Sequence, residues 1–238
     1  CLSDWSSDVC SSDLPTAIFT SLVESHYEKH GVVYRKPQSA EDKKKGRKGI
    51  ITGYDPKQTL PETYLVVDHL ALLDHESGLD TKGTMDRMSK QAVTLKNVFG
   101  LTPIFIQQFN TDLMASRRDA ITRRGVKDAG NVITPQRLDF GDSKYTYRDA
   151  EVVIALVKPM QFELPEYFGF NCEPTEMGGF GEYFVVGFIM KNRYGAADKK
   201  FPLFVNPVSG IFYDLPLGFG EEQPWYAYAK KLKEEWPT

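Results

Sequence analysis

Two short apolar runs that each end in polar residues are the most informative pattern along this chain. One covers residues 63–68 and ends in the carboxylate of Asp68, and the other covers residues 102–108 and ends in Gln107 and Gln108. Apolar runs of this length bounded by turn residues are typical of buried parallel strands. Nucleotide-binding α/β sheets place ligand groups at the carboxyl ends of such strands. An aspartate in this position can equally do no more than cap the next helix, so Asp68 alone leaves both interpretations open.

Apolar residues at helical spacing predict a helix on either side of the first strand. Residues 18–30 form one such segment, which a glycine ends, and residues 84–99 form the other, with Gly100 as the expected C-cap. A short strand is expected at 32–34. A polar, lysine-rich insertion at 36–48 then leads to the first apolar strand.

Beyond residue 108 the chain becomes polar and then returns to strand patterns. Residues 110–146 are polar, basic and glycine-containing, with one short helix expected at 112–121. A connection of this length inside a compact domain is usually functional or mobile. We then expect strands at 151–157, 183–191 and 201–206, a hairpin partner for the last strand at 211–213, and a closing helix at 225–236.

The first fourteen residues differ in character from the rest of the chain. Residues 4–14 match, residue by residue, one reading frame of a common sequencing adapter, so we interpret 1–14 as an artefact and 15–238 as part of one domain. Without them the formal charge of −3 becomes close to zero, and Cys172 is the single cysteine left. One cysteine excludes an intramolecular disulfide framework and fits a reducing cytoplasm. No apolar run approaches membrane-spanning length, so we expect no membrane partner.

Two basic runs stand out against this neutral background. The first is Lys43, Lys44, Lys45, Arg47 and Lys48, and the second is Arg117, Arg118, Arg123, Arg124 and Lys127. Either run can be an ordinary solvated loop, and that is the interpretation we favour for the first run.

Five segments, taken in chain order, carry a family resemblance. They are residues 65–73, 88–96, 104–110, 139–153 and 186–195. The last reads Val-Gly-Phe-Ile-Met-Lys-Asn-Arg-Tyr-Gly, which is similar to an apolar strand followed by Lys, Asn, Arg, Asn and Gly. In this order the segments resemble the RecA-like ATPase domain of the hexameric replicative DNA helicases of the DnaB family, and its phage-like members most.

The resemblance implies an α/β fold, a RecA-like P-loop NTPase core whose mostly parallel sheet is flanked by helices, followed by a C-terminal β-hairpin and helix. It implies ATP and Mg²⁺ as cofactors. Asp68 would hold Mg²⁺ through water, and Gln108 would contact the γ-phosphate. Lys191 and Arg193 would reach into the nucleotide site of the next subunit of a homo-oligomer, a hexameric ring. An arginine supplied in this way is worth roughly 10³ to 10⁵ in rate.

The glutamines, the two cations and His69 also have simpler interpretations. Gln107 and Gln108 alternate along the strand, so a shift of one residue in register would exchange the sensing residue with a packing residue. Lys191 and Arg193 can be ordinary surface cations. His69 stands where the family has Tyr, and we expect it to be packed or hydrogen-bonded rather than catalytic.

The resemblance also implies that the loops at 111–127 and 137–146 line a channel for single-stranded DNA, with basic side chains on the phosphates. The candidates are Arg117, Arg118, Arg123, Arg124, Lys127, Arg137 and Lys144. The implied function is that of a cytoplasmic replicative helicase, which couples ATP hydrolysis to translocation on single-stranded DNA and to duplex unwinding. A primase or a helicase loader would be a further partner.

The chain departs from the family pattern in one major respect, because the P-loop Gly-x-x-x-x-Gly-Lys-Ser/Thr occurs nowhere in it. In the family the P-loop and the catalytic glutamate lie upstream of these segments, so we expect an N-terminally truncated fragment that is inactive alone. Glu24 is rejected as that glutamate because it falls inside a predicted helix. Two other functions stay open. One is a RecA-like or KaiC-like ATPase, acting as a recombinase or regulator, and the other is a non-hydrolysing nucleic-acid-binding protein.

Overall fold

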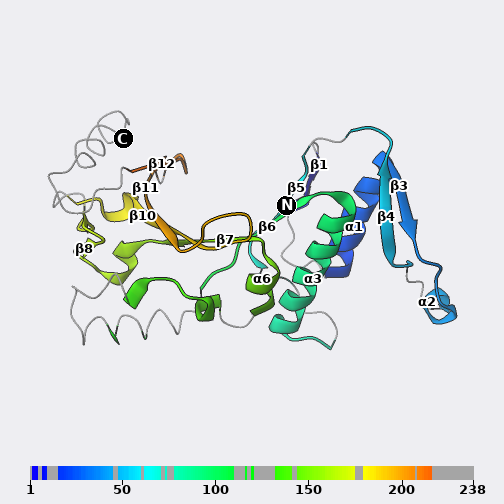
Figure 1. Ribbon diagram of the computed structural model, residues 1–238, viewed down its shortest axis with the longest axis horizontal. Helices are drawn as coiled ribbons and strands as arrows, with labels where there is room; N and C mark the ends of the chain where they lie inside the picture. The colour runs from blue at the N-terminus through cyan, green and yellow to red at the C-terminus, as the bar shows by residue number, and fades with distance from the viewer. Residues whose placement is uncertain are drawn as a thin grey trace. The chain divides into compact units, whose positions relative to one another are not determined.

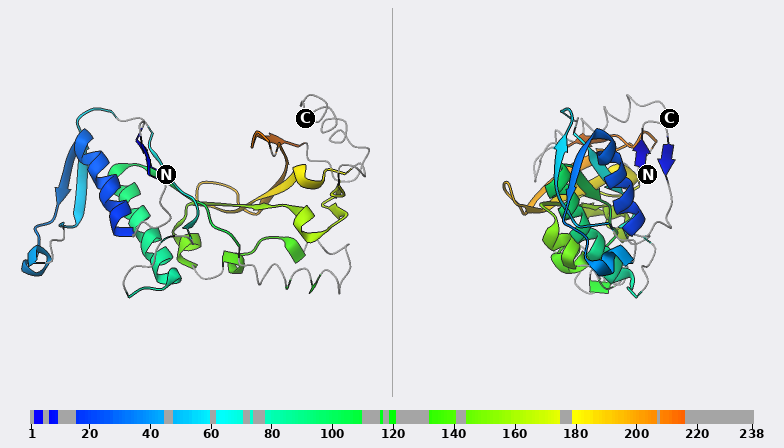
Figure 2. Two further views of the ribbon diagram at one scale, coloured as in Figure 1. Left: turned by 180° about the vertical axis from the view of Figure 1, so that it is seen from behind. Right: turned by 90° about the vertical axis from the view of Figure 1, so that its right-hand side faces the viewer.

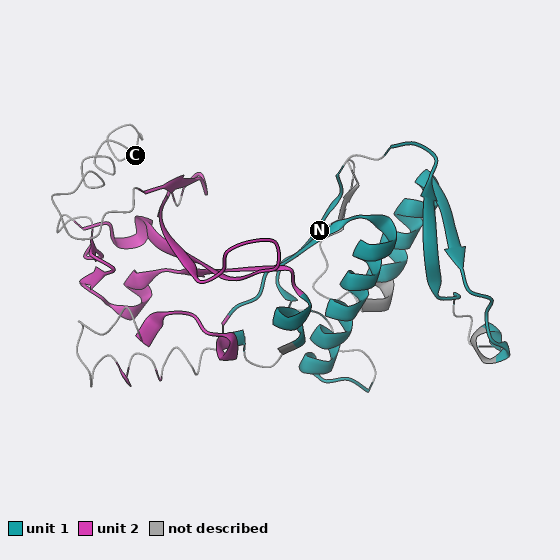
Figure 3. Cartoon of the chain, viewed as in Figure 1, with its two compact units in different colours: residues 1–108, 140–149 teal, residues 109–139, 150–238 magenta. Residues whose placement is uncertain are grey.

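In the computed structural model the chain divides into two units, which Figure 3 colours separately. Unit 1 comprises residues 1–108 and 140–149, and unit 2 comprises residues 109–139 and 150–238. The structure describes residues 2–4, 7–9, 16–44, 48–59, 62–70, 73, 78–109, 116, 119–120, 132–140, 144–174, 179–206 and 208–215. Each unit is described by itself. The prediction that residues 15–238 form one domain stays a prediction.

Unit 1 contains two longer helices, a hairpin and a parallel pair of strands (Figure 1). Its elements are β1 (Leu2–Asp4), β2 (Ser7–Val9), α1 (Thr16–His30), β3 (Gly31–Arg35), α2 (Ala40–Lys44), β4 (Ile51–Pro56), β5 (Tyr64–Val67), α3 (Thr81–Phe99), β6 (Thr102–Phe105) and α6 (Lys144–Asp149). Strands β1 and β2 pair with each other in an antiparallel two-stranded sheet.

Helices α1 and α3 lie side by side in both views and share one apolar core (Figure 2). The ring of Tyr27 on α1 stacks on Phe99 at the end of α3, with centroids 4.3 Å apart and an interplanar angle of 15°. Helix α3 begins at Thr81, earlier than predicted, because the Asp80 side chain accepts a hydrogen bond from the Gly83 N–H at 2.7 Å and caps it. Gly100 ends the helix in the left-handed region with φ 73°, as predicted.

The antiparallel hairpin of β3 and β4 was only half predicted, because residues 51–56 carry no strand pattern of their own. Val33 pairs with Tyr54, and Tyr34 pairs with Gly53. The Tyr34 hydroxyl donates to the Asp55 carboxylate at 2.8 Å across the hairpin. Strand β4 is therefore specified by its partner β3 rather than by its own sequence.

Unit 2 is built on one four-stranded sheet in the order β12-β11-β10-β7. Its elements are β7 (Val152–Val157), the 3-10 helix η4 (Pro159–Phe162), β8 (Glu166–Tyr167), β9 (Phe170–Asn171), the 3-10 helix η6 (Gly181–Tyr183), β10 (Phe184–Asn192), β11 (Lys199–Val205) and β12 (Phe212–Asp214). The 3-10 helix η3 (Arg137–Phe140) begins in unit 2 and ends in unit 1. The predicted strands at 151–157, 183–191, 201–206 and 211–213 are all found, and the last two form the predicted hairpin.

The prediction of a mostly parallel sheet is not confirmed, because every pairing in this four-stranded sheet is antiparallel. Short turns at 193–198 and 206–211 join β10 to β11 and β11 to β12, and connections this short join only antiparallel neighbours. Among the described strands, β5 and β6 form the parallel pair, and α3 provides the crossover between them. The expected helices at 112–121 and 225–236 lie mostly or wholly outside the described residues.

Candidate functional site

The two apolar runs form strands as predicted, and the carboxyl ends of β5 and β6 lie next to each other in a parallel pair. Val67 pairs with Phe105 at the end of the parallel ladder. Two further backbone bonds continue the pairing, from the Ile106 N–H to the Val67 carbonyl and from the Leu70 N–H to the Ile106 carbonyl, each at 2.9 Å. Asp68 thus follows one strand end directly beside the segment that carries the two glutamines.

Asp68 and Gln108 are both exposed at this edge. Along β5 the side chains of Leu65 and Val67 are buried in the core of unit 1, whereas Val66 is 42% exposed and Asp68 follows it in the alternation. Along β6 and its extension, the exposed positions include Ile106 and Gln108. Side chains two residues apart on a strand share a face. The structure therefore brings Asp68 and Gln108 to one open face at the carboxyl ends of two parallel strands.

Gln107 points the other way and is held by two hydrogen bonds. Its Nε2 donates to the Phe140 carbonyl at 3.1 Å, and its Oε1 accepts from the Thr146 hydroxyl at 3.1 Å. Gln107 is thus the packing residue, which leaves Gln108 as the glutamine available to a ligand.

His69 follows Asp68 directly, and the peptide bond between the two is cis. Both ring nitrogens of His69 are buried, and neither has a hydrogen-bond partner among the residues that the structure describes. The imidazole is therefore packed rather than hydrogen-bonded, which narrows the prediction made for it. The next residue, Leu70, is fully buried in the core of unit 1 and fixes the turn that Asp68 begins.

Helix α6 is fastened to α3 and so positions the segment that binds Gln107. The Ser89 hydroxyl donates to the Asp149 carboxylate at 3.0 Å, and the Lys90 ammonium lies 5.1 Å from the centre of the Tyr145 ring. Of the predicted DNA-binding residues, Arg137 is exposed on η3, and Lys144 is the first residue of α6. The remaining ones lie outside the described residues. They are Arg117, Arg118, Arg123, Arg124 and Lys127.

Lys191 and Arg193 flank Asn192 at the end of β10, where hydrogen bonds of the Asn192 side chain stabilise a turn. The Asn192 carbonyl oxygen Oδ1 accepts from the Tyr194 N–H at 3.0 Å, and its Nδ2 donates to the Ala196 carbonyl at 3.4 Å. The Arg193 N–H donates to the Glu151 carbonyl at 2.9 Å. Arg193 is exposed and Lys191 is half-buried. This pair belongs to unit 2, whereas Asp68 and Gln108 belong to unit 1.

The surroundings of two other reactive residue types, Glu24 and Cys172, exclude them as catalytic residues. Glu24 lies in the middle of α1, is 8% exposed, and accepts a hydrogen bond from Arg35 at 2.9 Å, so it is a structural ion-pair partner, as its predicted place in a helix implied. Burial raises the pKa of the Cys172 thiol to about 12, and its Sγ donates to the Phe170 carbonyl. Cys172 therefore stays protonated at neutral pH and is no nucleophile.

The donor groups at the β5–β6 edge fit one side of a magnesium nucleotide. Mg²⁺ is usually held by one or two carboxylates together with substrate phosphates and water, and Asp68 offers one exposed carboxylate. Among the described residues, no group of three or more His, Cys, Asp or Glu forms a metal site of its own. The P-loop, which cradles phosphates in many nucleotide-binding proteins, does not occur in this sequence.

Comparisons with known proteins identify the fold. No family model and no curated protein matches the chain. A structure described as a DnaB-like replicative helicase and its interactions with primase matches 87% of this chain and 36% of its own, with a TM-score of 0.52 and 14% identity. A second solved structure, described as an ATPase domain, matches with a TM-score of 0.51 and 14% identity, over 86% of this chain and 52% of its own.

The chain thus spans between about a third and half of the structures it resembles. No helix in the described part of the chain is both long and apolar enough to cross a membrane. At this level of identity the likeness concerns the fold alone, and the chain has the α/β fold of the DnaB-like helicase ATPase domain.

Proposed function

We propose that this chain is the C-terminal part of a replicative DNA helicase that couples ATP hydrolysis to movement along single-stranded DNA and to duplex unwinding. The observation that carries the proposal is the shared exposed face of Asp68 and Gln108 at the carboxyl ends of β5 and β6. A carboxylate and an amide at this edge suit a magnesium ion and a terminal phosphate. The DnaB-like fold supports the same class of enzyme.

The residues of unit 1 have separate roles in this proposal. Asp68 would hold Mg²⁺ through water, and the ion would offset the negative charge of the ATP phosphates. Gln108 contacts the γ-phosphate. Gln107, bonded to Phe140 and Thr146, ties the neighbouring position to residues 137–149 and so links the nucleotide edge to a DNA-binding loop.

Lys191 and Arg193 act on the nucleotide of a neighbouring subunit in the proposed ring. The turn at Asn192 and the bond from the Arg193 N–H to the Glu151 carbonyl hold the backbone of Arg193 in place, and its side chain is exposed. Positive charge at the transferring phosphoryl group stabilises its transition state. A hexameric ring is the proposed assembly, because each site is incomplete without a neighbour.

The remaining parts of the proposal lie mostly outside the described residues. A segment upstream of residue 15 supplies the P-loop and the catalytic glutamate, and residues 4–14 come from a sequencing adapter. Single-stranded DNA passes along 111–127 and 137–146, and a primase or a helicase loader binds the ring. The enzyme works in the cytoplasm and is phage-like.

A mixing experiment tests the proposal on rings of the protein extended by its upstream segment. Arg193→Ala should lower DNA-stimulated ATP turnover by roughly 10³-fold or more while leaving nucleotide affinity nearly intact. Asp68→Ala should damage the site of its own subunit. Mixed rings of the two variants should regain turnover, because an Asp68→Ala subunit still offers Arg193 to the intact site of its neighbour.

Lys199→Ala is the matched control, because Lys199 is an exposed cation at the start of the adjacent strand β11. It should keep full turnover. Full hydrolysis by Arg193→Ala in assembled rings, or mixed rings as inactive as either parent, would overturn the assignment of this turn.

A further inference from the structure

The first basic run of the sequence has no role in the proposed function. The structure describes three of its residues, Lys43, Lys44 and Lys48, in the connection between β3 and β4. We call residues 31–56, which comprise β3, α2 and β4, the arm. Figures 1 and 2 show α2 at the far end of the β3–β4 hairpin, beyond α1 and α3. We call residues 36–48 the tip of the arm.

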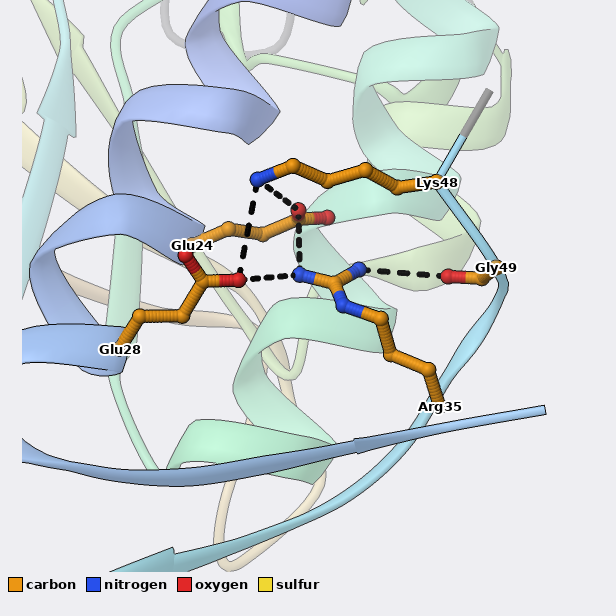
Figure 4. Close-up of polar contacts among 5 residues, drawn as sticks. All are labelled: Glu24, Glu28, Arg35, Lys48 and Gly49. Carbon is orange, nitrogen blue, oxygen red and sulfur yellow. Dashed lines mark hydrogen bonds and ion pairs between the residues drawn. The ribbon is translucent and has the colours of Figure 1, made fainter. Parts of the chain in front are cut away.

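We call Arg35 and residues 48–49 the neck of the arm. A network of ion pairs fixes the neck against α1 (Figure 4). The Arg35 Nη2 atom lies 2.9 Å from Glu24 Oε2 and 2.7 Å from Glu28 Oε1. Its Nη1 donates to the Gly49 carbonyl at 3.2 Å on the other side of the neck. The Lys48 ammonium adds looser contacts to the same two carboxylates, at 3.8 and 3.7 Å. The β3–β4 hairpin is therefore fixed to α1 at the end where the tip begins.

The ion pairs neutralise the two carboxylates of α1 close to the neck, and the tip keeps an excess of positive charge. The two carboxylates are matched by Arg35 and Lys48. Residues 36–48 contain six Lys or Arg and two acidic residues. Of these, Lys36, Lys43 and Lys44 are exposed and form no ion pair with another described side chain.

The composition of the tip selects among possible anionic partners. Residues 36–48 contain no aromatic residue, so the tip has no platform on which bases could stack. They contain no large aliphatic residue either, so α2 has no apolar face to bury in a membrane interface. Clustered lysines without apolar or aromatic companions suit a regular array of phosphates, which duplex DNA presents at about one charge per 1.7 Å of its axis.

We propose that the tip of the arm binds the phosphate backbone of nucleic acid, with duplex DNA as the preferred form, through Lys36, Lys43 and Lys44. The contact carries no base specificity. It is separate from the loops proposed to hold the single strand and from the nucleotide edge.

The test uses chain 1–238 without nucleotide, so its outcome does not depend on ATP hydrolysis. Fluorescence anisotropy measures binding to a labelled duplex and to a single strand of equal length over a series of salt concentrations. Lys43→Glu combined with Lys44→Glu should lower the slope of log affinity against log salt for duplex DNA by about 1.8, because each lost phosphate contact removes about 0.9. Lys43→Gln combined with Lys44→Gln should lower the slope equally without added repulsion.

The matched control changes the same charge elsewhere in unit 1. Lys57→Glu combined with Lys82→Glu reverses the charge at two exposed positions. Lys57 directly follows β4, at the end of the hairpin away from the tip, and Lys82 lies in the first turn of α3. The double variant should leave the slope unchanged. Far-UV circular dichroism checks that each variant folds.

Three results would overturn the proposal. They are an unchanged slope in both tip variants for duplex and single strand alike, an equal loss in the control, or competition by polyglutamate as strong as by DNA at equal charge, which would assign the tip to an acidic protein. A loss confined to single-stranded DNA would support phosphate binding and name the single strand as its source.

Discussion

The two units solve the burial of their sheets in different ways. In unit 2 the central strand β10 is buried from Phe184 to Phe188, and aromatic rings fill the core around it. In unit 1 the parallel pair of β5 and β6 buries one face and leaves Val66 and Ile104 each 42% exposed on the other. Parallel strands are normally covered on both faces. Unit 2 therefore covers its central strand with its own side chains, whereas the proposed nucleotide edge lies on a face that the described residues leave open.

Alkylation of Cys172 has the largest expected effect and tests whether the core of unit 2 is closed to solvent. In a variant with Cys1→Ser and Cys10→Ser, iodoacetamide at pH 8 should react roughly three orders of magnitude more slowly than with a free thiol, because a pKa of about 12 leaves little thiolate. Mass spectrometry follows the labelling. A rate close to that of a free thiol in the absence of denaturant would mean that the core of unit 2 opens readily.

Truncation of one strand side chain in each unit, buried in unit 2 and exposed in unit 1, compares the two sheets directly. Phe184 is fully buried and stacks on Phe170 with centroids 4.7 Å apart. Phe184→Ala should lower the free energy of unfolding by about 3 to 5 kcal/mol. Val66→Ala on the open face of unit 1 should lower it by only about 0.5 kcal/mol. Urea unfolding measures both values, and equal losses would mean that the exposed face of unit 1 is in fact covered.

The two glutamines after β6 test the proposed face at smaller cost. Gln107→Ala removes two partly buried hydrogen bonds and should destabilise unit 1 by about 1 to 2 kcal/mol, because the Phe140 carbonyl and the Thr146 hydroxyl lose a partner. Gln108→Ala should cost less than about 0.5 kcal/mol, since the side chain is exposed. The reverse order in thermal melts would exchange the two residues and remove Gln108 from the proposed site.

The smallest effect is a pH dependence of the ion pairs between α1 and the arm. The hydrogen bond from Arg35 lowers the pKa of Glu28 below its ordinary value of 4.5. A carboxylate with a lowered pKa adds stability that is present above the unfolded pKa and is lost as the pH falls through the folded one. We therefore expect a loss below about pH 4.5, of less than about 1 kcal/mol because the Glu28 side chain is 42% exposed and screened by solvent.

Arg35→Gln should flatten this loss, and thermal melts of both proteins between pH 3 and 6 measure the difference in slope. Hydrogen exchange of the β3 amides assigns it to the arm. Parallel pH profiles for the two proteins would contradict the role of Arg35 in lowering the pKa of Glu28.

Local patterns predicted the elements whose neighbours lie close in sequence. The apolar spacing of α1 and α3, the cap at Gly100 and the hairpin of β11 and β12 are all decided within a few residues, and the structure confirms them. Strand β4 was missed because Thr52, Gly53 and Asp55 show no alternation, and pairing with β3 makes it a strand. The antiparallel pairing in the four-stranded sheet was not predicted, because the alternation along a strand does not encode the direction of the neighbouring strand.

The candidate site shows the same division. The apolar runs were enough to predict two strands that end at Asp68 and at the glutamines, and the structure shows that these strands pair. The choice between Gln107 and Gln108 depends on Phe140 and Thr146, which lie 33 and 39 residues further along the chain, so no local pattern could settle it.

The closed neck of the arm also has a consequence for how this protein can change. The Lys36 N–H donates to the Ile50 carbonyl at 2.9 Å, and a side chain at Gly49 would collide with the Lys36 carbonyl, so the two strands are locked together before the tip begins. The tip can therefore be shortened, be lengthened or change its charge while α1 and α3 keep their packing. Among relatives of this chain, insertions and deletions should therefore gather between Lys36 and Lys48.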